Sequence, residues 1–66
     1  MKDNQNKVYF VRYTCRKDNG TIVEQFDDKT NLVGSWSEAN KLMQGYIEVF
    51  NVGCTKGIWR GIIKTL

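Results

Sequence analysis

The sequence of 66 residues has no histidine, no proline and only two cysteines, Cys15 and Cys54. Without histidine, a serine or cysteine nucleophile would need a lysine or a carboxylate as its base, and no motif supplies such a pair. The two cysteines are far apart in the chain and provide neither a Cys-x-x-Cys motif nor a Cys/His set for zinc. These absences predict a protein that is not an enzyme and that holds no metal.

Phosphate-binding motifs and long apolar segments are absent as well. Gly34 is a lone glycine without a G-x-G-x-x-G or Walker pattern, and a domain this small has little room for a ligand pocket beside its core. The first residues, MKDNQNK, are polar, and apolar runs are short, so neither a signal peptide nor a membrane span is indicated. We expect a cytoplasmic domain over residues 7–66, after a disordered polar tail over residues 1–6, with no cofactor and no small-molecule substrate.

The size of the chain and its cysteines bear on how the fold is stabilised. Domains of this length depend on a disulfide, a metal, an oligomer or very tight packing. Two cysteines in a chain without a secretion signal usually stay reduced and pack as small apolar side chains. Free thiols are therefore expected, and a disulfide between Cys15 and Cys54 is the alternative.

The net charge of +3 is concentrated at the C-terminal end. Residues 1–28 contain five basic and five acidic side chains, and residues 29–50 contain two of each. The last segment, residues 51–66, holds Lys56, Arg60 and Lys64 without any acid. This excess of basic residues makes the C-terminal segment the region where a binding function is expected.

Two runs rich in β-branched and aromatic residues, KVYFVRYTCR and TIVEQF, flank Asn19-Gly20 and predict a β-hairpin. A two-residue turn there pairs Tyr13 with Phe26, Cys15 with Glu24, Val11 with Asp28, Arg12 with Asp27 and Lys17 with Ile22. One face then collects the apolar side chains of Tyr9, Val11, Tyr13, Cys15, Ile22 and Phe26. The opposite face receives Val8, Phe10, Arg12, Thr14, Arg16, Val23, Gln25 and Asp27.

A helix is predicted after the hairpin. Ser35 and Glu38 have the spacing of a capping box, and Ala39, Leu42, Met43 and Tyr46 follow at helical spacing. Glycine is favoured just past a helix end, so we expect the helix to end near Gln44 and a third strand to begin at Tyr46. The alternative is one helix that continues to Phe50 or Asn51.

The chain closes with a strand, GIWRGIIKTL, in which Trp59 and Ile63 alternate with Arg60 and Lys64. The predicted fold is α+β, a mainly antiparallel sheet with one helix packed on one face, in the order ββαββ. With the longer helix the order becomes ββαβ. The size and the element order resemble, at the level of the fold only, small accessory and inhibitor proteins of phages and prophages.

The first functional hypothesis is a protein-interaction module. An apolar patch rimmed by arginine is typical of a protein interface, and the solvent-facing side of the predicted sheet has both components. Such a module binds another protein, or a second copy of itself as a homodimer, through an exposed sheet face or edge. The residues expected to bind the partner are Phe10, Arg12, Arg16, Val23, Arg60 and Lys64.

The second hypothesis is a weak, salt-sensitive nucleic-acid-binding domain, because cations interleaved with an aromatic ring suit single strands. The segment KGIWRGII loosely resembles a strand of the RNA recognition motif, although Ile58 and Ile62 stand at its two key aromatic positions. If Trp59 faces the helix instead, it belongs to the core. The residues that would bind nucleic acid are Arg12, Arg16, Lys56, Trp59, Arg60 and Lys64.

Overall fold

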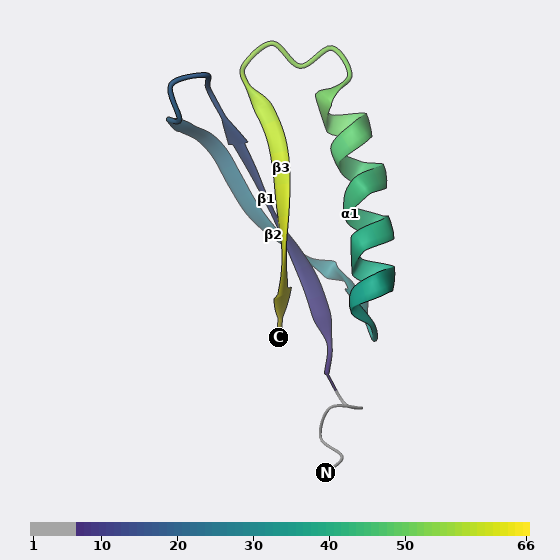
Figure 1. Ribbon diagram of the computed structural model, residues 1–66. Coiled ribbons are helices and arrows are strands. Elements are labelled where there is room, and N and C mark those ends of the chain that lie inside the picture. The colour runs from purple at the N-terminus through teal and green to yellow at the C-terminus, as the bar shows by residue number, and fades with distance from the viewer. Residues whose placement is uncertain (1–6) are drawn as a thin grey trace.

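A three-stranded antiparallel sheet carries one helix on one face (Figure 1). The computed structural model describes residues 7–66, so the predicted polar tail lies outside the described residues. The elements follow the order β1 (Tyr9–Arg16), β2 (Ile22–Val33), α1 (Trp36–Asn51) and β3 (Ile58–Thr65), and β1 is the central strand. The α+β class is therefore confirmed. The order is ββαβ, as in the alternative with the longer helix, and the predicted order ββαββ is wrong.

The helix α1 begins as predicted and ends later than predicted. Ser35 caps it by accepting a hydrogen bond from the backbone N–H of Glu38 at 3.1 Å. The chain stays helical through Gly45, and the predicted strand from Tyr46 does not form. Ile47 and Phe50 pack against the core as part of α1, and their burial outweighs the cost of about 1 kcal/mol for glycine inside a helix.

The turn between β1 and β2 spans residues 18–20 instead of Asn19-Gly20 alone. The backbone N–H of Gly20 donates to the carbonyl of Lys17, and the N–H of Lys17 donates to the carbonyl of Thr21, both at 2.9 Å. Gly20 has a φ of +90°, which glycine adopts without steric cost. One left-handed residue that closes a three-residue loop is a common hairpin connection.

This longer turn shifts the strand register near the hairpin end. Arg16 pairs with Ile22, so the predicted pairing of Lys17 with Ile22 is wrong. Ile22 consequently shares the face of Arg16, and it does not lie on the face of Tyr13 as predicted. An extra residue in β2, Val23, restores the expected register as far as Val11 and Asp28. A second shift beyond them pairs Tyr9 with Val33. The confirmed pairs are Val11–Asp28, Arg12–Asp27, Tyr13–Phe26 and Cys15–Glu24.

The core lies between the sheet and α1. Its buried side chains are Val11, Tyr13 and Cys15 of β1 and Trp59 of β3. The rings of Phe50 and Trp59 lie 5.1 Å apart, centroid to centroid, so the helix packs directly on the last strand. Both cysteines are free thiols, with Cys15 buried and Cys54 packed against the core.

Candidate binding face of the sheet

The sheet face that points away from α1, here called the outer face, is built by alternate residues of all three strands. Because β1 pairs with both neighbours, Arg12 lies between Asp27 and Ile62, and Thr14 lies between Gln25 and Arg60. Among the described elements, α1 is the one that packs on the sheet, and it covers the opposite face. The outer face comprises Phe10, Arg12, Thr14, Arg16, Ile22, Val23, Gln25, Asp27, Ile58, Arg60, Ile62 and Lys64.

Arg12 and Asp27 form an ion pair across the two strands, as the predicted register requires. The Nε of Arg12 donates to Oδ1 of Asp27 at 2.6 Å, and Nη2 donates to Oδ2 at 3.2 Å. This bonding lowers the pKa of Asp27, and the nearby charges of Lys29 and Lys64 lower it further. The single acid of the outer face is thus held ionised by the basic residues around it.

Positive charge dominates this face. Arg16 donates to the carbonyl of Gly20 at 3.0 Å, and the ammonium of Lys29 lies 5.1 Å from the centroid of the Phe10 ring. With Asp27 as the only acid among the residues that form the face, the surface has a net positive charge. We call the four basic residues of this face, together with Lys29 over the Phe10 ring, the outer-face bases: Arg12, Arg16, Lys29, Arg60 and Lys64.

Three isoleucines interrupt this positive surface, and we call Ile22, Ile58 and Ile62 the outer-face isoleucines. They are 47%, 51% and 58% exposed, respectively. Ile22 and Ile58 flank Arg16 on its two neighbouring strands, and Ile62 lies beside Arg12. About half of each residue is therefore open to solvent between charged neighbours, so its burial against a partner would be favourable.

Five of the six predicted partner-binding residues are accessible on the outer face, and the sixth, Phe10, is buried. Arg12, Arg16, Arg60 and Lys64 lie together on the outer face, and Val23 is 40% exposed at its hairpin end. Phe10 is only 5% exposed, and the ammonium of Lys29 lies over its ring. Phe10 therefore supports the face from beneath and offers little surface to a partner.

Sequence reasoning placed Ile22 with the core and so missed it as a residue of this face. The assignment depended on a two-residue turn, since each added turn residue exchanges the two faces of the strand. Asn19-Gly20 is compatible with both turn lengths, so no feature of the sequence separates them.

The residues predicted to bind nucleic acid are divided between the two faces. Trp59 is 7% exposed and lies in the core, on the side of α1. Lys56 pairs with Glu24 and lies 5.9 Å from the Trp59 ring centroid, so it belongs to the helix side as well. The other four predicted residues, Arg12, Arg16, Arg60 and Lys64, are on the outer face. No aromatic ring is thus exposed among these four cations.

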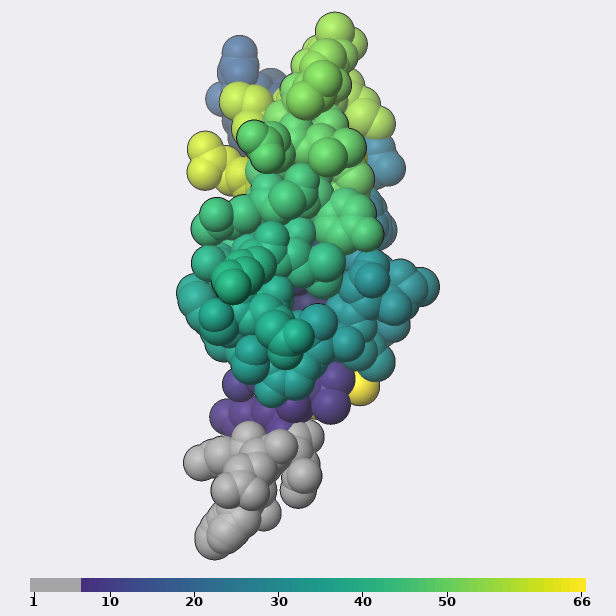
Figure 2. All heavy atoms as spheres, turned by 90° about the vertical axis from the view of Figure 1, so that its right-hand side faces the viewer, coloured from purple at the N-terminus to yellow at the C-terminus, as the bar shows by residue number. Residues whose placement is uncertain are grey.

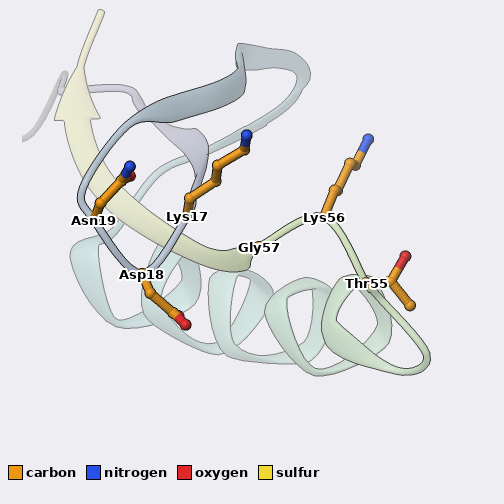
Figure 3. A pocket seen from close by; sticks show the side chains of 6 residues that line it. All are labelled: Lys17, Asp18, Asn19, Thr55, Lys56 and Gly57. Atoms are coloured by element: carbon orange, nitrogen blue, oxygen red, sulfur yellow. The ribbon is translucent and has the colours of Figure 1, made fainter.

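Lys56 also borders an open hollow of about 480 Å³ between the hairpin turn and the loop before β3 (Figure 3). Lys17 and Asn19 line it from the turn, and Thr55 and Gly57 line it from the loop. Its lining comes from two exposed connections. These residues form a shallow surface feature and not an enclosed ligand site.

Comparisons with known proteins found no match: no family model fits the chain, and no curated protein or solved structure is significantly similar to it. Within residues 7–66, no helix has the length and apolar character needed to cross a membrane. The same part of the chain contains no group of three or more cysteine, aspartate or glutamate residues that could hold a metal ion.

Proposed function

We propose that the chain is a small non-enzymatic interaction module whose outer face binds an acidic, partly apolar surface on another protein. The observation that carries this proposal is the placement of the outer-face isoleucines among the outer-face bases. Interfaces combine an apolar centre with a polar rim, and arginine is enriched in them. An accessory or inhibitor protein of the phage type would act in this way, by occupying a surface of its target.

The isoleucines favour a protein over nucleic acid as the partner. Affinity for nucleic acid comes from cations on phosphates and from aromatic rings on bases. Half-exposed isoleucines serve neither purpose, and the ring of Trp59 is buried on the helix side. The nucleic-acid hypothesis therefore retains only the charge of the face in its support.

Two other binding modes fit the structure less well than an acidic partner on the outer face. One is a second copy of the chain at this face, and the other is a strand added at the β3 edge. Two outer faces placed against each other would oppose their positive charges, which disfavours self-association there. At the edge of β3, the side chain of Asn51 bonds both the N–H and the carbonyl of Trp59. These two backbone groups are therefore already satisfied, which hinders pairing with an added strand.

The test is affinity capture followed by direct binding. The full chain is immobilised and incubated with cytoplasm of its source, and captured proteins are purified and titrated by calorimetry. We expect an acidic protein that binds with one-to-one stoichiometry per chain. Arg60→Glu, on the outer face, should weaken that binding at least about tenfold, or by about 1.4 kcal/mol.

The matched control is Lys17→Glu, which makes the same change of charge in the exposed hairpin turn. It should leave the affinity within about twofold of the unmodified chain, because Lys17 lies beyond the strand residues that form the outer face. Equal loss in both variants would mean that only net charge matters, and it would refute a specific outer-face site.

Titration with single-stranded and duplex DNA and RNA at low salt should show no binding. Tight binding there that Arg60→Glu abolishes would favour the nucleic-acid alternative.

A further inference from the structure

The solvent-facing side of α1 contains a glycine that the fold of this chain does not require. A Cβ atom added at Gly45 would meet nothing within 4 Å. At Gly61, by contrast, an added Cβ would lie 2.6 Å from Cγ of Met43. Glycine inside a helix costs about 1 kcal/mol relative to alanine. No contact within the chain therefore accounts for glycine at position 45.

Gly45 forms part of an apolar hollow on the exposed helix. The hollow has a volume of about 370 Å³ and is lined by Lys41, Leu42, Gly45, Tyr46 and Val49. Val49 is 66% exposed, and Tyr46 is 37% exposed. In Figure 2 the helix faces the viewer, and its outward side has no other described element over it. Small residues let a second helix approach closely, so the hollow has the shape that another helix would fill.

We infer that a second copy of this chain docks here, with the two α1 helices antiparallel and the two Gly45 residues facing each other at a two-fold axis. In that arrangement Lys41 of one copy lies opposite Val49 of the other and beside its Glu48. The symmetry repeats the contact, so two Lys41–Glu48 pairs flank the glycines. A parallel arrangement would instead bring like charges together.

The charge pattern of the helix selects a second copy as the occupant. Lys41 and Glu48 are both exposed and lie seven residues apart, on the same side of α1 as Gly45. The charged residues nearest Gly45 are thus a cation before it and an anion after it, and this part of the surface is complementary to itself under a two-fold rotation. Glu38, the other acid of α1, lies a turn further away and accepts a hydrogen bond from the capping Ser35. The outer face lies on the other side of the sheet, so a dimer formed through α1 would present two free outer faces.

A single helix pair is a small interface, below the roughly 1,200 Å² typical of stable complexes. We therefore expect a weak dimer, measured by sedimentation equilibrium from about 10 µM to about 1 mM, with dissociation in the micromolar range. The mass should rise with concentration from 7.7 kDa towards twice that value. A mass that stays at 7.7 kDa throughout the range would overturn the inference.

Charge reversal tests the arrangement. Lys41→Glu puts an anion on each side of Gly45, and Glu48→Lys puts a cation on each side. Each variant should remain monomeric at concentrations where the unmodified chain dimerises. An equimolar mixture of the two variants should restore the dimer, because the anionic and cationic helices then match. If either variant alone dimerises as well as the unmodified chain, the antiparallel helix pair is wrong.

Gly45→Gln separates an effect on the dimer from an effect on the fold. Glutamine is a better helix former than glycine, so the isolated chain should melt at a higher temperature at low concentration. Its longer side chain should abolish the rise in mass. A dimer that survives Gly45→Gln but dissociates in Arg60→Glu would place the interface on the outer face and overturn the inference.

Discussion

The side chain of Asn51 bonds both backbone groups of Trp59. Oδ1 of Asn51 accepts from the N–H of Trp59 at 2.8 Å, and Nδ2 donates to its carbonyl at 3.2 Å. Asn51 is the last residue of α1, and Trp59 lies near the start of β3. One amide thus joins the end of the helix to the free edge of the sheet and fixes the loop between them.

Asn51→Ala should destabilise the fold by about 2 kcal/mol, because it removes two hydrogen bonds and leaves the backbone of Trp59 without its partner. The change is measured as the shift of the urea unfolding midpoint. Gln44→Ala, at an exposed position of the same helix, is the control and should change stability by less than about 0.5 kcal/mol. Equal effects of the two substitutions would show that the Asn51 contact contributes nothing.

Gly57 and Gly61 should respond differently to alanine. At Gly61 the added Cβ meets the flexible side chain of Met43, so we expect a loss of about 1–3 kcal/mol in the free energy of unfolding. At Gly57 it would lie 2.5 Å from the backbone carbonyl oxygen of Arg16, which cannot move without disturbing β1. Gly57→Ala should therefore be the more destabilising of the two in thermal and urea unfolding. The reverse order would contradict this account of the packing.

The hairpin and the last strand could be predicted in outline from the sequence because their determinants are local. Alternation of apolar and polar residues identified the hairpin, and it correctly placed Arg12 opposite Asp27. The end of the helix could not be predicted in this way. Gly45 favours a helix end, and only the packing of Phe50 against Trp59, which are distant in sequence, overrides that preference.

The candidate face could be predicted only in part, because alternation along a strand is a local pattern and strand pairing is not. The period of two placed Arg60 and Lys64 on the side opposite Trp59, as observed. That β3 pairs with β1, and so brings Arg60 next to Thr14, depends on a long-range contact that no local pattern encodes. The burial of Phe10 was also missed, because alternation places Phe10 on the solvent-facing side and says nothing of what lies over its ring.

Tyr13 has a buried hydroxyl with no hydrogen-bond partner among the described residues. Burial raises the pKa of Tyr13 to about 12. The folded state thus holds the phenolic proton more tightly than the unfolded state, and stability falls as the pH rises from about 10 to about 12. Tyr13→Phe removes an unpaired polar atom at nearly constant volume.

We expect Tyr13→Phe to be at least as stable as the unmodified chain at neutral pH, with a gain of up to about 1 kcal/mol. Its stability should fall less between pH 10 and 12, which urea unfolding at several pH values would measure. A loss of more than about 1 kcal/mol at neutral pH would indicate that the hydroxyl has a partner after all.

Asp28 is held by the residues that follow it in β2. Oδ1 of Asp28 accepts from the hydroxyl of Thr30 at 2.6 Å, and Oδ2 accepts from the amide of Asn31 at 2.8 Å. The hydrogen bond from Thr30 is the main cause that lowers the pKa of Asp28 below its ordinary value of 3.8. The unfolded state therefore binds the proton first, and this contribution to stability is lost as the pH falls below 3.8.

Thr30→Val should raise the pKa of Asp28 towards its ordinary value, because valine keeps the shape of the side chain and removes the hydroxyl. Titration of the Asp28 carboxyl followed by NMR measures the change. The pKa of Asp27, which depends on Arg12, should stay lowered in the same variant and serves as the internal control. An unchanged Asp28 titration would show that Asn31 and the backbone suffice to hold the carboxylate.

The two thiols should differ in reactivity towards an alkylating agent such as iodoacetamide. Burial raises the pKa of Cys15, whereas the backbone N–H of Lys56 lowers the pKa of Cys54. The thiolate is the nucleophile, so near neutral pH Cys54 should be labelled in the folded protein and Cys15 only after unfolding. Peptide mass spectrometry at successive times distinguishes the two sites.

In Cys54→Ser, the labelling of Cys15 should remain slow, because the sheet and α1 still cover it. Rapid labelling of Cys15 in the folded chain would mean that the core opens at this end far more often than its packing implies.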